Sequence, residues 1–497
     1  MLRDDILKYY PKRFAEWSIL SFVTSLLVCS IIYSSRMMPL YLWCFGLVSV
    51  FMFFYGSNKY SKEWLFFSEK TFSKHVIYVG FAIRLVYVIF IYFLNNALYG
   101  KPMEVVSLDA DYYVPCAWES ASLVLDGYCA DAVIIPKGIM GEFNIFDIWS
   151  LWMDMRLNIT DCGYQYYLML VYVLTGQISK FIIPLILKAL WGSLTCLLIY
   201  RVARRHFRED VAKLASIFCL LQPNMIWWCG SMMKETEMVL LFLLFIDRAD
   251  AFIENEHKSL QAIIIVVLLG IVMYAFRAAL CVVEFVALFM AIVIMDNKII
   301  SVSKKIIAGI ALALIIGVTY GGQLINEVRE MHETVVSDHQ KTNMEWRAQR
   351  ENGNKFAIYA KATIFAPLIF AIPFPTLTYT HKDQEMLMQV AGGNFVKNVL
   401  SFFVILTFFS FVLSGEWRNH VFLITVLIGY LLALILSEFA QSGRFHMPAI
   451  PLEMMFAAYA LCNITPRQTR WFKYVLIAEV FICIGWQWFK LAGQGLI

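Results

Sequence analysis

Two carboxylates of this chain stand where a membrane protein could use them for chemistry. Asp109 and Asp111 lie in the segment from Ser107 to Tyr113, which begins eleven residues after an apolar run from Val76 to Asn96. A run of this length can cross ~30 Å of hydrocarbon as a helix, so both carboxylates are expected close to the point where that helix leaves the bilayer. There a carboxylate can accept a proton from a hydroxyl group or help to hold a cation.

Basic groups recur in other connections on the same expected side of the membrane. Lys234 and Glu235 lie in a short turn between two apolar runs. Arg277 separates two further runs, and Arg444 with His446 separates another two. Each of these alone is explained by a charge at a span end that reaches toward water. Their recurrence predicts an anionic ligand, since Arg binds phosphate through two hydrogen bonds and Lys acts as a point charge.

The composition predicts an all-α polytopic membrane protein. Of 497 residues, 60% are hydrophobic and 16% are charged, whereas about a quarter of a soluble protein is charged. The mean hydropathy is +0.66. Apolar runs long enough to span a bilayer fill the chain and predict about 13 transmembrane helices. They cover residues 16–34, 38–56, 77–96, 180–200, 211–228, 237–255, 260–276, 278–295, 306–323, 396–414, 420–438, 447–463 and 472–489.

The basic residues predict the orientation of these spans. Most of them cluster in alternate connections, such as Arg201 to Arg208, and this pattern places the N-terminus in the cytoplasm. Two long segments, 97–179 and 324–395, then face outward. The net charge is only +4 and is scattered in short clusters, which argues against a nucleic-acid partner and for membrane lipids.

Both outward segments are expected to carry helices that lie at the membrane surface. The pattern from Phe143 to Met153 is aromatic and amphipathic, which suits a helix in the headgroup region. The apolar stretch from Ala357 to Tyr379 contains Pro367, Pro373 and Pro375. These prolines favour an interfacial or re-entrant helix over a fourteenth span.

The boundaries of the spans divide the chain into four expected parts. Residues 1–76 hold two N-terminal spans and a cytoplasmic linker, and residues 77–323 form the membrane core with the first outward loop. Residues 324–395 are the second outward loop, and residues 396–497 are the C-terminal spans. The sequence lacks the GxxxxGK[ST], GxGxxG, HExxH and GxSxG patterns, so nucleotide hydrolysis, dinucleotide redox chemistry, zinc proteolysis and serine hydrolysis have no signature here.

The acidic segment resembles a motif of a known enzyme superfamily. Asp109-Ala-Asp111-Tyr-Tyr113, followed by Ala117 and Gly127, is similar to the first-loop motif of the GT-C glycosyltransferases that use polyprenyl-phosphate sugars. That superfamily includes protein O-mannosyltransferases and aminoarabinose transferases. Three further stretches are similar to bacterial members: Leu194 to Phe207, Gln222 to Trp228 with Lys234-Glu235 following, and Glu438 to Pro451.

The resemblance implies a fold, a reaction and a site. It implies a glycosyltransferase of the bacterial inner membrane that moves a sugar, with inversion, from a polyprenyl-phosphate donor to an acceptor hydroxyl on a glycan, lipid or protein at the extracytoplasmic face. Asp109 would be the general base, and Asp111 would assist or bind the acceptor or a metal. Many members have Asp-Glu where this chain has Asp109-Ala110, so the resemblance leaves open which of the two aspartates is the base. The donor phosphate would be bound by Lys234, Arg277, Arg444 and His446, with Tyr113, Glu235 and Glu438 as further site residues. It leaves open whether a divalent metal assists.

Other functions stay open at this stage. A polymerase or ligase of polyprenyl-pyrophosphate glycans would also work at the outer face, and a lipid-linked sugar flippase would need broken spans in two matching halves. A structural subunit would give no reason for charges to gather on one side. Five charged residues fall inside apolar runs and are expected to pair between helices or to line a polar path: Arg84, Lys188, Glu284, Glu453 and Glu479.

Overall fold

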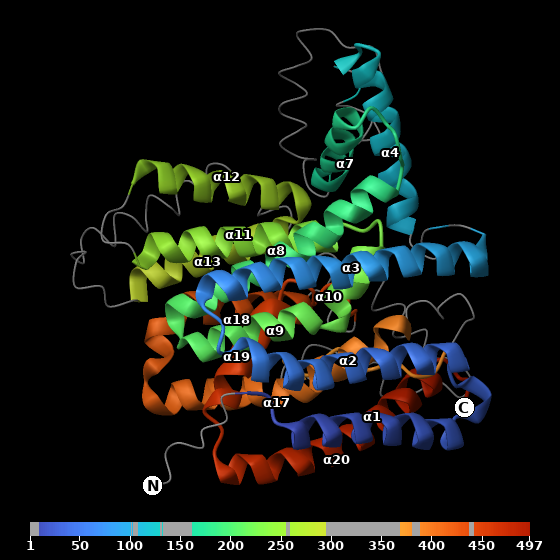
Figure 1. Ribbon diagram of the computed structural model, residues 1–497, viewed down its shortest axis with the longest axis vertical. Coiled ribbons are helices and arrows are strands. Elements are labelled where there is room, and N and C mark those ends of the chain that lie inside the picture. The colour runs from blue at the N-terminus through green and yellow to red at the C-terminus, as the bar shows by residue number, and fades with distance from the viewer. Residues whose placement is uncertain are drawn as a thin grey trace. The chain divides into compact units, whose positions relative to one another are not determined.

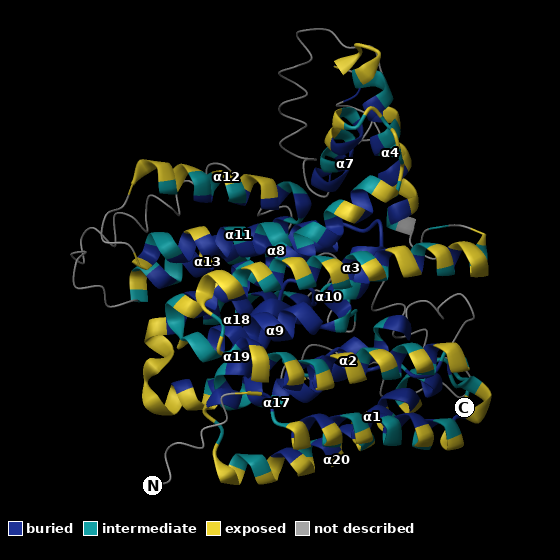
Figure 2. Ribbon diagram, in the orientation of Figure 1, coloured by how far each residue is buried: buried dark blue, intermediate teal, exposed yellow. Residues whose placement is uncertain are grey.

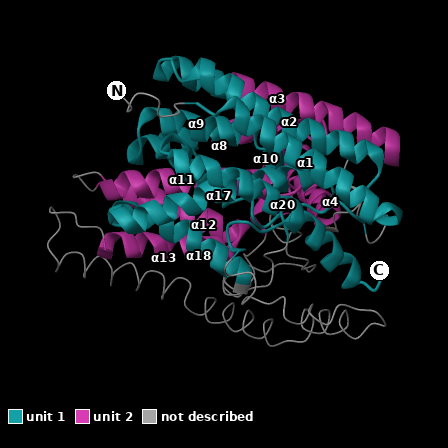
Figure 3. Ribbon diagram, turned by 90° about the horizontal axis from the view of Figure 1, so that it is seen from below, with its two compact units in different colours: residues 1–77, 196–227, 327–497 teal, residues 78–195, 228–326 magenta. Residues whose placement is uncertain are grey.

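The computed structural model describes residues 9–100, 102, 108–129, 132, 162–254, 259–294, 368–379, 388–436 and 442–497, and these residues are mostly helical (Figure 1). Within these described ranges, seven helices are long and apolar enough to cross a membrane, which agrees with an all-α membrane protein. The chain divides into two compact units (Figure 3). Unit 1 comprises residues 1–77, 196–227 and 327–497, and unit 2 comprises residues 78–195 and 228–326.

Unit 1 is built around two short central helices, α9 and α19, which pack on each other. Figure 2 shows α9 as buried along its length. Helices α17 and α2 pack against this pair, and α1 packs on α2 and α20. The elements of this unit are α1 (Lys12–Ile32), α2 (Leu40–Trp64), α9 (Glu209–Leu221), α10 (Pro223–Trp227), α17 (Ala391–Ser414), η7 (Glu416–His420), α18 (Val421–Leu436), α19 (Ile450–Cys462) and α20 (Pro466–Ala492).

The ends of the unit 1 helices follow local sequence signals. Helix α20 begins with a capping box, in which Thr465 and Gln468 each bond the backbone of the other, and Pro466 occupies its first turn. Helix α17 ends at Gly415, whose φ of 77° is the left-handed conformation that glycine adopts most easily.

Unit 2 holds the helices that carry the acidic segment and two of the predicted basic connections. Helix α4 packs on α7, α7 packs on α12, and α11, α12 and α13 pack on one another. Helices α3 (Glu69–Tyr99) and α8 (Ile182–His206) run from one unit into the other. The remaining elements are α4 (Leu108–Leu125), α7 (Gly163–Leu174), η3 (Trp228–Gly230), α11 (Glu235–Glu254), α12 (Leu260–Phe276) and α13 (Ala278–Ile294).

The predicted span at 211–228 is not one continuous helix. Helix α9 ends at Leu221, and the chain turns at Gln222 with extended backbone angles before α10 begins at Pro223. Proline cannot donate the helical hydrogen bond and disfavours a helical residue before it, so the expectation of an unbroken span fails here. The 13 residues of α9 rise only about 20 Å as a helix.

The described part of the second predicted loop is not an interfacial helix. Residues 368–379 form turns and an extended segment, in which Thr378 makes an isolated bridge with Met37. Gln487 of α20 accepts hydrogen bonds from the backbone N–H groups of Leu377 and Thr378 at 2.9 and 3.2 Å. Two prolines in this stretch, Pro373 and Pro375, account for the absence of a helix. The predicted interfacial helix at 143–153 and the predicted span at 306–323 lie outside the described residues.

Candidate functional site

Tyr164, in the first turn of α7, is the residue at which the predicted site elements of unit 2 meet. Its ring is fully buried and lies edge-on to Tyr113 of α4, with 5.4 Å between the ring centroids. It also contacts Phe276 at the end of α12, at 6.4 Å. The preceding Gly163 permits this approach, because a Cβ there would lie 2.7 Å from the Phe276 ring.

Lys188 of α8 is fully buried beside the same tyrosine. Its Nζ lies 5.1 Å from the centroid of the Tyr164 ring and 2.6 Å from Oε2 of Glu237 on α11. The same ammonium donates to the carbonyl oxygen of Met233. Because a charge buried in this way is costly unless it is paired and hydrogen-bonded, these contacts hold α8, α7 and the start of α11 in one arrangement.

Lys234 and Glu235 lie in a buried turn and not in one open to water. Lys234 is 2% exposed, Glu235 is 0% exposed, and Lys234 Nζ donates to the carbonyl oxygen of Phe276 at 2.9 Å. The expectation that this connection is open to water is therefore wrong for both side chains. Arg277 follows Phe276 directly and is half-buried between α12 and α13.

The acidic segment forms the first turn of α4. Asp109 is half-buried, Asp111 is exposed, and Tyr113 is buried. Asp109 and Tyr113 are four residues apart and therefore share one face of the helix, whereas Asp111 lies on another. Tyr113 contacts Tyr164, so Asp109 is on the side of α4 that turns toward the buried residues of unit 2.

Arg444 and His446 belong to unit 1, and Glu438 lies outside the described residues. Arg444 and His446 occupy a turn between α18 and α19. The hydroxyl of Tyr430 in α18 donates to the carbonyl oxygen of Phe445 in this turn at 2.6 Å. Arg444 is half-buried and His446 is buried. The structure therefore brings Asp109, Tyr113, Lys234 and Arg277 into one unit, while Arg444 and His446 belong to the other.

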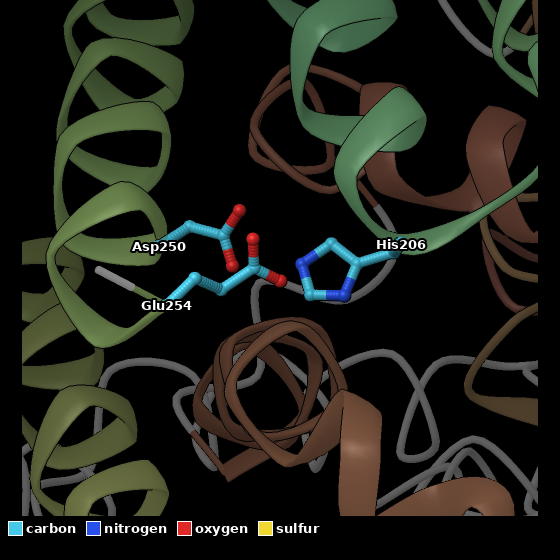
Figure 4. Close-up of side chains that lie close together, drawn as sticks. All are labelled: His206, Asp250 and Glu254. Atoms are coloured by element: carbon cyan, nitrogen blue, oxygen red, sulfur yellow. The ribbon is translucent and has the colours of Figure 1, made fainter. Parts of the chain in front are cut away.

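The carboxylates expected to bind a metal, if one is used, do not gather with further ligands in the described part of the chain. Asp109 and Asp111 are not in a group of three side chains placed to hold an ion there. Figure 4 draws Asp250 and Glu254, which lie one turn apart on α11 of unit 2, together with His206, the last residue of α8, which belongs to unit 1. Asp250 is buried and Glu254 is exposed.

Three comparisons were made, with protein-family models, with curated proteins and with solved structures. None of them gave a match. The interpretation of the site therefore depends on its residues and their geometry.

Three residues of this site were not predicted as members of it: Lys188, Glu237 and Tyr164. The available signal was the lysine inside an apolar run, since such a charge needs a partner. Ion pairing between helices is confirmed for Lys188 and Glu453, whereas Glu479 has an uncharged partner on another helix. Lys188 pairs with Glu237, Glu453 with Lys397 at 3.2 Å, and Glu479 accepts from Asn398 at 3.1 Å. Arg84 donates to the carbonyl oxygen of Gly80 in its own helix.

Proposed function

We propose that this chain is an integral membrane glycosyltransferase of the GT-C type. It moves a sugar from a polyprenyl-phosphate donor to an acceptor hydroxyl, with Asp109 as the general base. The observation that carries the proposal is the contact set of Tyr164, which joins the helix of Asp109 to Lys188 and to Phe276, the carbonyl partner of Lys234. The helix that carries Asp109 and the ammonium groups of Lys188 and Lys234 thus belong to one neighbourhood of unit 2.

The chemistry needs little beyond a base and cations. The acceptor hydroxyl oxygen attacks the anomeric carbon, the bond from that carbon to the phosphate oxygen breaks, and the phosphate leaves with the bonding electrons. Asp109 takes the hydroxyl proton, and attack from the face opposite the phosphate inverts the anomeric centre. Phosphate is a good leaving group that needs no proton, so nucleotide-binding motifs are not required.

The basic groups would stabilise the charge of the departing phosphate. Arg277 is half-buried and has the planar group that binds phosphate through two hydrogen bonds. Lys234 donates to a neutral carbonyl oxygen, and a phosphate oxygen would be a stronger partner for the same ammonium. Burial strengthens each of these interactions, because little water competes for them.

The finer architecture is part of the same proposal. Thirteen crossings, which would include α11, the shorter helices α12, α13 and α19, and the broken stretch formed by α9 and α10, would place the N-terminus in the cytoplasm and Asp109 at the outer face of a bacterial inner membrane. Membrane lipids and the lipid tail of the donor would surround the apolar helix faces. The partners are then a polyprenyl-phosphate sugar and a glycan, lipid or protein acceptor.

The test is an assay in which the purified chain transfers sugar to added acceptors. The donors are lipid-linked sugars extracted from cell membranes. Asp109→Asn is expected to lower the rate at least 100-fold, because a general base contributes about 10²–10⁴-fold. Asp111→Asn, which changes an exposed carboxylate two residues away, serves as the matched control and is expected to lose less than tenfold. A purified Asp109→Asn variant that transfers sugar at the parent rate would remove Asp109 from this role.

A lipid-linked sugar flippase is the second candidate. The broken helix at Gln222 and Pro223 favours it, because transporters bind substrates at discontinuous helices. Reconstituted vesicles separate the two functions. A flippase would move the intact donor between leaflets, whereas a transferase would release polyprenyl phosphate.

A further inference from the structure

Five uncharged polar side chains form a cluster in unit 1 at the break between α9 and α10. We refer to them as the amide cluster: Gln222, Asn224, Trp227, Gln389 and Asn394. Gln222 and Asn224 flank Pro223, Asn394 lies in the first turn of α17, and Gln389 lies just before that helix. Asn224 Nδ2 donates to Asn394 Oδ1 at 2.8 Å, and Trp227 Nε1 donates to Gln389 Oε1 at 2.7 Å. None of these residues belongs to the site proposed above.

Two carbonyl oxygens of the amide cluster lack a hydrogen-bond donor among the described residues. These are Oε1 of Gln222 and Oδ1 of Asn224, and both are buried. The amide of Gln222 reaches the carbonyl oxygen of Gly393 only at 3.4 Å, which is a long hydrogen bond. A buried acceptor without a donor destabilises a fold, so two of them beside one helix break indicate groups that a ligand could satisfy.

Glycines keep the backbone close to the cluster on two sides. A Cβ at Gly393 would lie 2.0 Å from Asn224 Oδ1, so this amide lies directly over the first turn of α17. A Cβ at Gly443 would lie 3.2 Å from Asn394 Oδ1. Gly443 and the following Arg444 are half-buried, so the cluster lies immediately beneath a turn that reaches solvent.

We propose that the amide cluster binds the hydroxyl groups of a sugar ring. Hydroxyls both donate and accept hydrogen bonds, and side-chain amides offer both functions in a planar pair. The five side chains are uncharged, which favours a neutral polyhydroxyl ligand over a phosphate. Trp227 adds an indole with an apolar face for the C–H groups of a ring. This inference rests on the proposed function, because the sugar would be that of the donor or that of the acceptor.

The test compares two fully buried glutamines of unit 1. Gln222→Leu removes Oε1 of Gln222, a buried acceptor to which no described group donates. The Tm of the full-length chain in detergent is therefore expected to stay or rise, while sugar binding falls at least tenfold. Gln487→Leu is the matched control, because Gln487 accepts from Leu377 and Thr378 and donates to the carbonyl oxygens of Pro375 and Cys483. It is expected to lower the Tm and leave sugar binding by the folded fraction unchanged.

Binding is read by saturation-transfer NMR with methyl glycosides of common hexoses, pentoses and N-acetylhexosamines, and with cyclohexanol as the probe that has one hydroxyl. Saturation that depends on Gln222 and is absent for cyclohexanol supports the proposal. Equal saturation in the parent and Gln222→Leu chains, or a fall of Tm in Gln222→Leu without a loss of sugar binding, overturns it and leaves the cluster a structural contact between helices.

Two kinetic arms identify the source of the sugar. Hydrolysis of the donor, which releases free sugar, needs no acceptor. A raised KM for the donor in this hydrolysis by Gln222→Leu shows that the cluster binds the sugar of the donor. A raised KM for the acceptor alone identifies the acceptor sugar, and an unchanged KM for both overturns the proposal. If the parent chain shows no transfer or hydrolysis but binds glycosides through Gln222, the proposed function fails and the sugar site stands.

Discussion

Lys188 is a buried charge whose removal would leave its partner uncompensated. Its ammonium is fully buried and has Glu237, the Met233 carbonyl oxygen and the Tyr164 ring as partners. Removing one member of a buried ion pair leaves the other charge uncompensated, so Lys188→Met is expected to lower the free energy of unfolding by about 3–5 kcal/mol. The double variant Lys188→Met with Glu237→Leu is expected to be close to the parent. Thermal unfolding of the parent, the two single variants and the double variant measures the interaction energy between Lys188 and Glu237. Equal losses of stability in the single and double variants would contradict the predicted ion pair.

The partner of such a charge could not be chosen from the sequence. The cost of Lys188 inside an apolar run predicted that a partner exists. Glu237 is 49 residues away along the chain, and only the packing of α8 against the start of α11 selects it over Glu235. The spacing of Asp109 and Tyr113 was readable, but the half-burial of Asp109 and the exposure of Asp111 depend on how α4 packs on α7.

At the scale of the element, a glycine sets how closely α3 and α8 approach. A Cβ at Gly192 would lie 2.6 Å from Nε and 2.8 Å from Cδ of Arg84, and 2.8 Å from Sγ of Cys229. Gly192→Ala is therefore expected to displace the buried Arg84 side chain and to destabilise the chain by about 1–3 kcal/mol. The measurement is the midpoint of thermal unfolding in detergent.

Gly485 in α20 is the matched control for that substitution. A Cβ at Gly485 meets nothing within 4 Å, so Gly485→Ala changes only the backbone entropy of a helix. Alanine is favoured over glycine inside a helix by about 1 kcal/mol, and this variant should be as stable as the parent or more stable. Equal responses of the two glycines would mean that the contact with Arg84 does not limit the packing of α8.

Element boundaries were predictable where capping signals are local. The predicted span at 396–414 ends where α17 does, before Gly415. The capping box of Thr465 marks the start of α20 in the sequence, but the predicted span at 472–489 begins six residues after Pro466. The break after Leu221 was also marked, by Pro223, but the apolar run continues across it and outweighed that signal. The side-chain amides of Gln222 and Asn224 at this break donate to Gly393 and Asn394 of α17, some 170 residues further along the chain, and this pairing could not be read from the sequence.

At the scale of the whole molecule, the contacts of unit 1 agree with the sidedness that the basic residues predict. Two connections expected outside the cytoplasm meet where Met37 pairs with Thr378. Connections expected inside meet at Lys213, which donates to the carbonyl oxygens of Leu65 and Phe67 at 3.1 and 2.7 Å. These pairings fix which connections share a side of unit 1, and a labelling experiment decides which side faces the cytoplasm.

Cysteine labelling of intact cells measures that orientation. Cys129 follows α4 and is exposed, so a maleimide that does not cross membranes is expected to label it from outside. Cys129→Ser should remove this fast reaction and leave the slower one of Cys116. Lys62→Cys, at an exposed position expected inside, is the control that reacts only after permeabilisation. Labelling of Cys129 only in permeabilised cells would place α4 in the cytoplasm and exclude an extracytoplasmic Asp109.

The rate of labelling at a second thiol checks that α4 is packed as described. Burial raises the pKa of the half-buried Cys116 thiol above its ordinary value. A raised pKa lowers the thiolate fraction at pH 7, and the thiolate is the form that attacks maleimide. Cys116 should therefore react at least several-fold more slowly than Cys129 at pH 7, and its rate should still rise about tenfold per unit between pH 7 and 8. Equal rates at the two thiols would show that the face of α4 bearing Cys116 is open to water and is not packed as described. The basis for placing Asp109 beside the buried residues of unit 2 would then be lost as well.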